Sequence, residues 1–238
     1  MNLHKFPSFN LYTDHPVALD SRDHTHPHGT KNDNTRNRKF VDKVTKWFWM
    51  KGPINFLDIG CAGGGLVSDM DRAGHFAVGL EGSNYNLLNQ RAEWAVTPHL
   101  FATCDVTHPF LLCHNDVDAN TYKPIKFNFV SAFDTLEHFP EDRLDQFFIN
   151  LKTHLAPGGI FVASISANEE FHHVCVHPRE WWEEKFQENG FTLRQDVLDY
   201  LRPDFVRGPD QPEDSGSPRA GGSFHLACSI SNGDGLRN

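Results

Sequence analysis

The chain of 238 residues is long enough for one sizeable α/β domain and short for two. Hydrophobic residues make up 39% of it and aromatic residues 12%, which excludes a globally disordered chain. The formal net charge of −9 leaves no broad basic surface for a nucleic-acid backbone, so a polynucleotide substrate is disfavoured.

The N-terminal sequence MNLHKFPSFNLYTDHP lacks the continuous apolar core of a signal peptide. No run approaches the roughly 20 apolar residues of a membrane span. We therefore expect a soluble, cytoplasmic protein without a membrane partner. The five cysteines are scattered and form no CxxC pair, which favours reduced, buried thiols over disulfides or a zinc site.

Residues 1–34 are rich in Asp, Asn, His, Pro and Thr and follow neither the alternation of a strand nor the period of a helix. This pattern predicts an irregular arm or lid before a catalytic domain at 35–238. A helix is predicted to begin near residue 35, capped by Asn34 or Thr35, with an apolar face that packs on a sheet.

From residue 54 onward the sequence alternates between predicted strands and helices. We expect strands at 54–60, 76–82, 100–106, 127–135 and 159–166, helices at 64–73, 84–95, 141–155 and 178–190, and two last strands at 191–201 and 223–230. Apolar strands without polar alternation are typical of a parallel sheet covered on both faces.

The connections of this sheet carry their own signals. Gly158 and Gly190 are predicted to end helices. The segment 109–126 is longer than a typical connection and is predicted to be a small hairpin or lid. The segment 207–222 is rich in Pro, Gly and Asp and is predicted to be a loop.

The stretch NFLDIGCAGGG, residues 55–65, runs from a buried strand into a glycine cluster. In a doubly wound sheet the ligand binds at the carboxyl ends of the strands, so this turn is the floor of the predicted site. Glu81 ends the next strand 23 residues beyond Asp58, where an acidic side chain can accept both hydroxyls of a ribose. The combination indicates a ligand that contains adenosine.

The glycine spacing narrows the choice of ligand. The dinucleotide motif GxGxxG needs a glycine at position 62, where this chain has Ala62. A GxxxxGK[ST] loop is excluded because no lysine follows the cluster. Neither a pyrophosphate nor a triphosphate therefore has its usual binding loop.

The stretches LDIGCAGGG, GLEGS, CDV and AFDTLEHF together resemble the motif series of class I S-adenosylmethionine-dependent methyltransferases of the small-molecule type, over about residues 35 to 230. The resemblance implies a Rossmann-like doubly wound sheet of seven mostly parallel strands, with an antiparallel last strand and helices on both faces. It implies S-adenosylmethionine as the cofactor and S-adenosylhomocysteine as the product.

The resemblance also implies where the cofactor lies. The glycine turn is expected under its methionine part, Glu81 at the ribose and Asp105 at the adenine, with the glycines allowing close approach of the backbone. The cofactor-binding residues carried over in this way are Asp58, Gly60, Cys61, Ala62, Gly63, Glu81, Gly82, Ser83, Asp105, Val106 and Phe133. An N-terminal segment commonly folds over the cofactor in this family, so Asn34, Asn37 or Arg38 is expected to contact its carboxylate.

The fourth strand ends in SAFDTLEHF, which places Asp134, Glu137 and His138 near the reactive end of the cofactor. Methyl transfer is an in-line displacement, and a hydroxyl acceptor must also lose a proton. His138 is a natural general base because an imidazole titrates near pH ~6.5, and a capping or supporting role is its equal alternative. No metal site is predicted, because the adjacent Glu137 and His138 do not make a site on their own.

Further candidates follow the fifth strand, in SANEEFHHVCVHPREWW. Candidates for a base or for sugar binding are Glu169, Glu170, His172, His173 and His177, of which His173 joins His138 and Asp134 as a predicted catalytic residue. Trp181 and Trp182 are candidates for an acceptor platform, although core packing is favoured for one of them.

Three histidines in HTHPH, His24, His26 and His28, suggest a metal site. Because Pro27 separates two of them and no second ligand group is evident, a solvated loop is favoured.

The acceptor is predicted by exclusion. The chain lacks the Asp-Pro-Pro-Tyr type signature of DNA amino methylation and the Pro-Cys nucleophile of cytosine methylation, and it is acidic. These absences favour a small molecule. The LEH form of the fourth motif resembles that of enzymes acting on metabolites such as quinol precursors and sugars, and the His- and Trp-rich region fits a sugar hydroxyl better than a flat apolar ring. We therefore predict a small-molecule O-methyltransferase, acting on a sugar or glycan. The alternatives are an N-methyltransferase for an amine or protein side chain, and a non-catalytic cofactor-binding partner subunit. The oligomeric state stays open.

Overall fold

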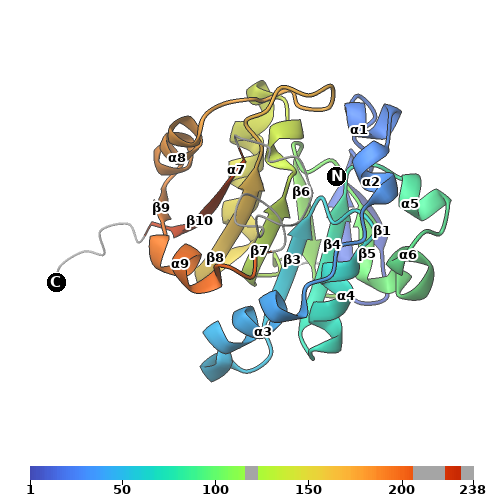
Figure 1. Ribbon diagram of the computed structural model, residues 1–238. Coiled ribbons are helices and arrows are strands. Elements are labelled where there is room, and N and C mark those ends of the chain that lie inside the picture. The colour runs from blue at the N-terminus through green and yellow to red at the C-terminus, as the bar shows by residue number, and fades with distance from the viewer. Residues whose placement is uncertain (116–122, 206–222, 232–238) are drawn as a thin grey trace.

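The computed structural model describes residues 1–115, 123–205 and 223–231. A seven-stranded sheet crosses its centre in the order β5-β4-β3-β7-β8-β10-β9 (Figure 1). Its strands are β3 (Asn55–Ile59), β4 (Phe76–Glu81), β5 (Phe101–Thr103), β7 (Phe127–Phe133), β8 (Leu155–Ile165), β9 (Phe191–Leu193) and β10 (Phe224–Ile230). β10 pairs antiparallel with β8 and β9, whereas the other pairs are parallel. The predicted fold class is confirmed.

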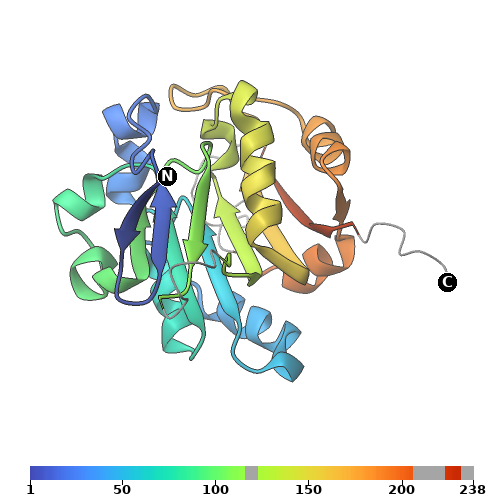
Figure 2. The same cartoon turned by 180° about the vertical axis from the view of Figure 1, so that it is seen from behind.

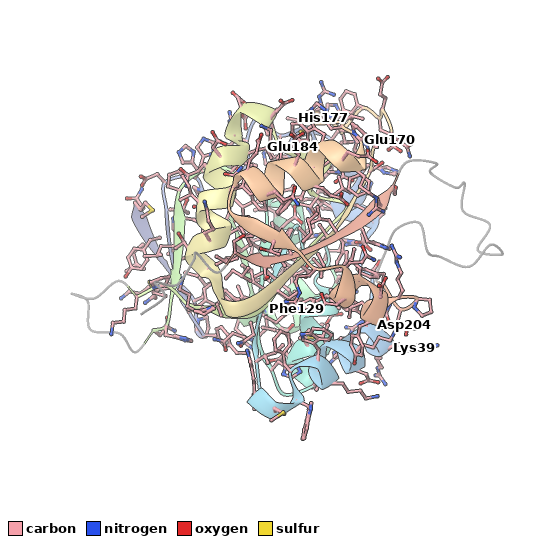
Figure 3. The ribbon with its side chains drawn as sticks, turned by 90° about the vertical axis from the view of Figure 1, so that its left-hand side faces the viewer. Lys39, Phe129, Glu170, His177, Glu184 and Asp204 are labelled. Carbon is pink, nitrogen blue, oxygen red and sulfur yellow. The ribbon has the colours of Figure 1, made fainter. Side chains whose placement is uncertain are left out.

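Helices cover both faces of this sheet. The helices of one face are α3 (Arg38–Trp47), α4 (Gly65–Arg72), α6 (Glu93–Val96) and α9 (Gln195–Leu201), and those of the other are α7 (Leu144–His154) and α8 (Arg179–Glu188). Figure 3 shows Phe129 of the sheet between Glu184 on α8 and, on the other side, Lys39 on α3 and Asp204 after α9. Each face buries its own apolar cluster, as parallel strands require. Within the described ranges, no helix combines the length and apolar character needed to cross a membrane.

A second, smaller sheet packs beside α7 (Figure 2). It contains β1 (Asn2–Lys5), β2 (Asn10–Thr13) and β6 (Phe110–Cys113), in antiparallel pairs. The predicted hairpin or lid at 109–126 is therefore only partly described: β6 pairs with the N-terminus, while residues 116–122 lie outside the described ranges. The predicted loop at 207–222 also lies outside them.

The prediction that residues 1–34 are irregular was wrong. They contain β1, β2 and two short helices, α1 (Arg22–Thr25) and α2 (His28–Asn32), and the HTHPH motif runs from the end of α1 to the first residue of α2. Helices and strands of four or five residues are too short to show a hydrophobic period. Phe9 and Leu11 are buried in the main core, where β2 pairs with β6, which is distant in the sequence.

Other predicted boundaries also moved. α3 begins at Arg38 and is capped by Asn37 rather than by the predicted Asn34 or Thr35. The side chain of Asn37 accepts a hydrogen bond from the Phe40 amide at 3.0 Å. The helix expected at 84–95 is two short ones, α5 (Tyr85–Leu88) and α6. Residues expected as one strand at 191–201 form β9 followed by α9.

The two predicted helix stops had different outcomes. Gly190 follows α8 with φ +78°, a left-handed conformation that favours glycine, and that prediction is confirmed. Gly158 lies inside β8, three residues beyond the end cap of α7 at Leu155, and does not end a helix.

Candidate active site

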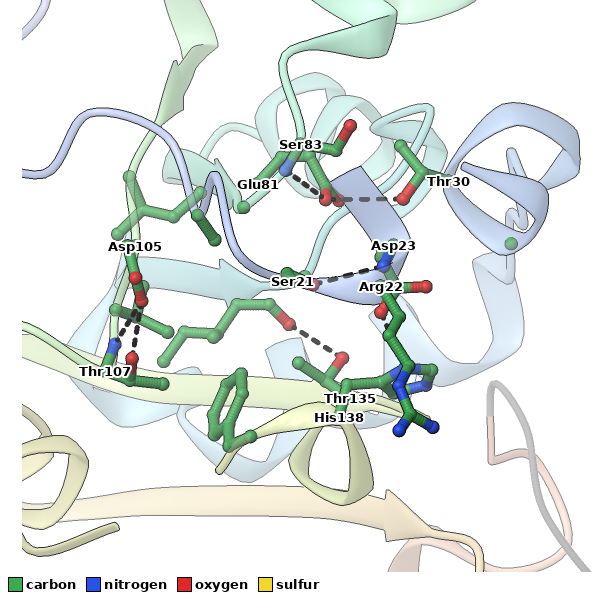
Figure 4. A pocket seen from close by; sticks show the side chains of 18 of the residues that line it. Ser21, Arg22, Asp23, Thr30, Glu81, Ser83, Asp105, Thr107, Thr135 and His138 are labelled. Carbon is green, nitrogen blue, oxygen red and sulfur yellow. Dashed lines mark hydrogen bonds and ion pairs between the residues drawn. The ribbon is translucent and has the colours of Figure 1, made fainter. Parts of the chain in front are cut away.

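A pocket of about 220 Å³ opens at the carboxyl ends of β3, β4, β5 and β7 (Figure 4). The strand ends form its floor, and residues 18–33 form a wall opposite them. The predicted residues that line it are Gly60, Ala62, Glu81, Gly82, Ser83, Asp105, Val106, Phe133, Asp134 and His138. The predicted residues outside the lining are Asn34, Asp58, Cys61, Gly63 and His173.

Glu81 ends β4 as a buried carboxylate. Its Oε2 accepts a hydrogen bond from the Ala62 amide at 2.8 Å, and its Oε1 accepts from the Ser83 amide at 3.1 Å and from the Thr30 hydroxyl at 3.4 Å. Burial raises the pKa of Glu81, and the two backbone donors oppose that rise. The glycine turn and the strand end therefore fix this carboxylate at the pocket wall.

The glycine turn is shaped mainly by the chain itself. A Cβ on Gly60 would collide with Thr135, one on Gly63 with the backbone of Asp33, and one on Gly64 with Phe101. Gly64 also has φ +86°. Our expectation that the glycines make room for the cofactor was wrong for Gly63 and Gly64, because protein atoms occupy that space, and of the predicted glycines in the turn only Gly60 lines the pocket.

Several predicted residues lie behind the turn. Asp58 is buried and accepts a hydrogen bond from the Ser131 hydroxyl at 2.6 Å, and burial raises the pKa of its carboxyl to about 7. Burial also raises the pKa of the Cys61 thiol, which makes it a poor nucleophile. Asn34 packs against Gly63, with its Nδ2 atom 3.5 Å from Oε1 of Glu93. Asn34 thus holds the turn and does not reach into the pocket.

Asp105 follows β5 and is held by its own neighbours. Its Oδ1 accepts from the Thr107 amide at 3.0 Å and from the Thr107 hydroxyl at 2.6 Å, and its Oδ2 lies 2.9 Å from Nδ1 of His108. Val106 adds an apolar side chain to the same wall. The pocket thus presents a carboxylate at the end of β4 and an acid beside an apolar surface at the end of β5.

The far end of the pocket is formed after β7. His138 lines it, and its Nδ1 lies 2.7 Å from Oδ2 of Asp23 (Figure 4). Burial lowers the pKa of His138, but the carboxylates of Asp23, Glu137 and Asp134 together raise that pKa above its usual value. Asp134, in a left-handed conformation with φ +48°, donates its amide to Ser164 Oγ at 2.9 Å. A strained backbone next to a charged cluster is common at functional sites.

Residues 18–33 reach the pocket through contacts at both ends. The Ala18 amide donates to the Gly82 carbonyl at 2.9 Å, and the Arg143 guanidinium pairs with Asp20 at 2.7 Å. At the other end, Nε2 of His172 lies 2.8 Å from the His26 carbonyl. The sequence predicted that the cofactor is contacted near residue 34, whereas the residues of this segment that line the pocket come from earlier positions, 18–33.

The sequence missed Asp23, Thr30, Thr135 and Arg143 as lining residues. Polar residues within short helices and turns carry no periodic signal that would distinguish them from solvated loops. The reading of HTHPH as a solvated loop was only partly right, because His26 and His28 are exposed while Nδ1 of His24 is buried.

The histidine-rich segment after β8 reaches the pocket through Val174, and the candidates Glu169, Glu170, His172, His173 and His177 do not line it. Trp182 is fully buried in the core, as favoured for one of the two tryptophans. Trp181 stacks on His177 with ring centroids 3.8 Å apart and is not a pocket residue. The expected tryptophan platform is therefore wrong.

A family model described as a methyltransferase domain matches residues 31–196. The chain belongs to this methyltransferase family. The match spans the glycine turn, Glu81, Asp105 and His138, and it confirms the predicted family and enzyme class. No curated protein matches the sequence.

Solved structures give the same fold at low identity. An S-adenosylmethionine-dependent methyltransferase from Clostridium acetobutylicum ATCC 824 has a TM-score of 0.53 and 12% identity, over 87% of this chain and 97% of that one. The magnesium protoporphyrin IX methyltransferase of Synechocystis PCC 6803 with bound SAH has a TM-score of 0.51 and 16% identity, over 90% and 96%. The DhpI–SAH complex has a TM-score of 0.52 and 15% identity, over 93% and 100%. At such identities the likeness concerns the fold.

Proposed function

We propose that the protein uses S-adenosylmethionine to methylate a hydroxyl group of a small molecule, such as a sugar. The single observation that carries this proposal is the pairing of His138 with Asp23 at the end of the pocket, 2.7 Å apart. An amine acceptor needs no such group once it is neutral, whereas a hydroxyl must lose its proton as it attacks.

The pocket suits this cofactor in its charge and its donor set. Six acidic side chains and two arginines line it, which favours a ligand with a positive sulfonium and ammonium. Glu81 has the position of a ribose acceptor, and Val106 with Ile59 and Leu80 supplies apolar surface for an adenine. Structures of this fold with bound SAH are among those similar to the chain.

The cofactor supplies an electrophilic methyl group on a sulfonium, and the protein supplies alignment and proton removal. His138 and Asp134 lie at one end of the pocket, and Glu81 with Asp105 lies at the other strand ends. A bound S-adenosylmethionine would give its methyl group to the acceptor oxygen and keep the electron pair of the broken carbon–sulfur bond on sulfur. The hydroxyl proton passes to the imidazole of His138, while Asp23 orients the ring.

The acceptor is expected to be polar. Asp20, Ser21, Arg22 and Arg143 line the same pocket as Asp134 and offer both donors and acceptors of hydrogen bonds. Such a lining suits a molecule with several hydroxyls better than a flat apolar ring.

The test is a methyl-transfer assay with S-adenosylmethionine and matched acceptor sets: sugars, phenols and primary amines of similar size. We expect a mass increase of one methyl group on a sugar hydroxyl. Methylation of the amines alone would replace this proposal with N-methylation. Cofactor binding without turnover on any set would favour a non-catalytic subunit.

A further inference from the structure

The far end of the pocket brings together three side chains that the sequence keeps apart. Glu137, His138 and His173 each offer a ligand atom, and these atoms lie within 4.8 Å of one another. The first two belong to the short turn Leu136–His138 after β7, and the third comes from the segment after β8. The rings of His138 and His173 meet edge to face with centroids 5.0 Å apart.

Glu137 offers one carboxylate oxygen to this cluster. Its side chain is fully buried, and its Oε1 accepts a hydrogen bond from the Ser166 amide at 3.0 Å. Its Oε2 is buried and has no hydrogen-bond partner in the part of the chain that the structure describes. A buried oxygen of this kind is costly unless it is protonated or bound to a cation.

Both imidazoles are oriented through their Nδ1 atoms. Nδ1 of His173 lies 2.7 Å from the Asn168 carbonyl, which can only accept, so this nitrogen carries the proton. Nδ1 of His138 faces the Asp23 carboxylate at 2.7 Å. The ring of His173 is left with Nε2 as its available lone pair, which is the arrangement that backbone carbonyls impose on metal-binding histidines. His138 contributes one of its two ring nitrogens to the cluster.

We propose that Glu137, His138 and His173 bind a divalent transition-metal ion, of the Mn²⁺ or Zn²⁺ kind, at the acceptor end of the pocket. Two imidazole nitrogens and one carboxylate oxygen suit such ions better than Mg²⁺ or Ca²⁺, which prefer oxygen ligands. Three protein ligands leave further coordination positions for water or for oxygens of an acceptor. Because His138 also lines the pocket, the ion would lie beside the acceptor.

A second cluster of possible metal ligands can be compared with this one. Glu141, Cys175 and His177 also have ligand atoms within 4.8 Å of one another. However, Nε2 of His177 already pairs with Glu141 at 2.8 Å, and burial raises the pKa of the Cys175 thiol to about 12. A neutral thiol is a poor ligand for Mn²⁺, so this cluster is not the preferred site.

The catalytic consequence rests on the proposed function, whereas the binding of the ion does not. A hydroxyl bound to a divalent ion loses its proton more easily, in the way that bound water does. With the ion present, His138 serves as its ligand and the acceptor proton passes to solvent or to a neighbouring carboxylate. The ion then performs the activation that His138 performs alone in its absence.

The test is a titration of the full-length, chelator-treated protein with MnCl₂, followed by the electron paramagnetic resonance signal of free Mn²⁺. We expect one bound Mn²⁺ per chain, displaced by Zn²⁺ and little affected by Mg²⁺. His173→Ala and the isosteric Glu137→Gln should each weaken binding by more than about tenfold. His99→Ala, on the short turn Pro98–Leu100 and outside the cluster, should bind as the wild type does.

Absence of Mn²⁺ and Zn²⁺ binding in the folded wild type would overturn the proposal. Binding that survives both His173→Ala and Glu137→Gln but is lost in His177→Ala would also overturn it, in favour of the second cluster. The role in catalysis is tested separately: the chelated protein should bind S-adenosylmethionine normally but transfer the methyl group more slowly, and added Mn²⁺ should restore the faster rate. Ion binding without any methyl transfer would sink the proposed function and leave the metal site standing.

Discussion

The two ends of the pocket satisfy their polar groups in different ways. At the end that we assign to the cofactor, Glu81 and Asp105 are held by backbone amides, hydroxyls and a histidine. At the acceptor end, Glu137 keeps a buried oxygen without a partner among the described residues, and His138 faces several carboxylates. Hydrogen-bonded groups bind a ligand rigidly, whereas incompletely paired ones favour proton transfer or metal binding.

The contrast also follows the chain. The cofactor end is built from β3, β4 and β5 with the turns that follow them. The acceptor end needs residues 18–33, the turn after β7 and the segment after β8 to meet. The first end is therefore determined by local sequence motifs. The second end forms only when segments that are distant in the sequence pack together.

The largest effect is expected at the acceptor end. His138→Ala should lower kcat for methyl transfer by about 10²- to 10⁴-fold, because it removes the group that receives or activates the hydroxyl proton. Its affinity for S-adenosylmethionine, measured by calorimetry, should stay close to that of the wild type. His99→Ala, on the short turn Pro98–Leu100, is the matched control and should keep full activity. A fully active His138→Ala protein would remove the distinction between the two ends.

The reverse pattern is expected at the cofactor end. Glu81→Gln should weaken S-adenosylmethionine binding by about 10- to 100-fold, because a neutral amide replaces a charged acceptor. At saturating cofactor, kcat should change little. Glu184→Gln, on the exposed side of α8, serves as the control in the same titration. If Glu81→Gln lowered kcat and left the affinity unchanged, the assignment of the two ends would be reversed.

The pH dependence of stability tests a buried histidine, His154, that lies outside both ends of the pocket. His154 is buried under the small sheet, where its Nδ1 lies 3.1 Å from the Ile125 carbonyl, and burial lowers the pKa of His154 to about 4. The unfolded chain binds the proton near pH ~6.5, so stability from this group is present above that pH and is lost toward pH 4. Between pH 7 and 4 the wild type should lose about 3 kcal/mol more than His154→Gln. Urea unfolding at both pH values measures this, and equal losses would count against the buried neutral imidazole.

The last comparison separates two reasons for glycine, and its smaller member is the smallest effect expected. Gly64→Ala should destabilise the fold by about 3 kcal/mol, because it adds a collision with Phe101 to the strain of a positive φ. Gly190→Ala has the same kind of φ but nothing within 4 Å of the added Cβ, so about 1 kcal/mol is expected. Thermal unfolding compares the two, and similar losses would mean that Phe101 moves aside freely.

The cofactor end could be predicted from sequence because its signals are local. Apolar strands ending in the glycine turn and in Glu81 follow from spacing along the chain, and the structure places Glu81 at the pocket. The reason for the glycines could not be predicted, since Asp33 and Phe101 fill the space at the turn only in the folded protein.

The acceptor end could be predicted only in part. His138 and Asp134 follow a strand and were identifiable, but Asp23, the partner of His138, lies in a four-residue helix with no periodic signal. His173 could not be predicted as a neighbour of Glu137 either, because the two residues meet only when the segment after β8 packs against the turn after β7. For Trp181 the sequence predicted a role at the site that the structure does not show: its ring stacks on His177 and does not line the pocket.

The most direct test is a calorimetric titration of the purified protein with S-adenosylmethionine and, separately, with NAD. The arrangement of Glu81, Asp105 and the glycine turn predicts binding of S-adenosylmethionine in the micromolar range, at one molecule per chain, and no binding of NAD. Binding of NAD alone would contradict the cofactor assignment and, with it, the division of the pocket into a cofactor end and an acceptor end.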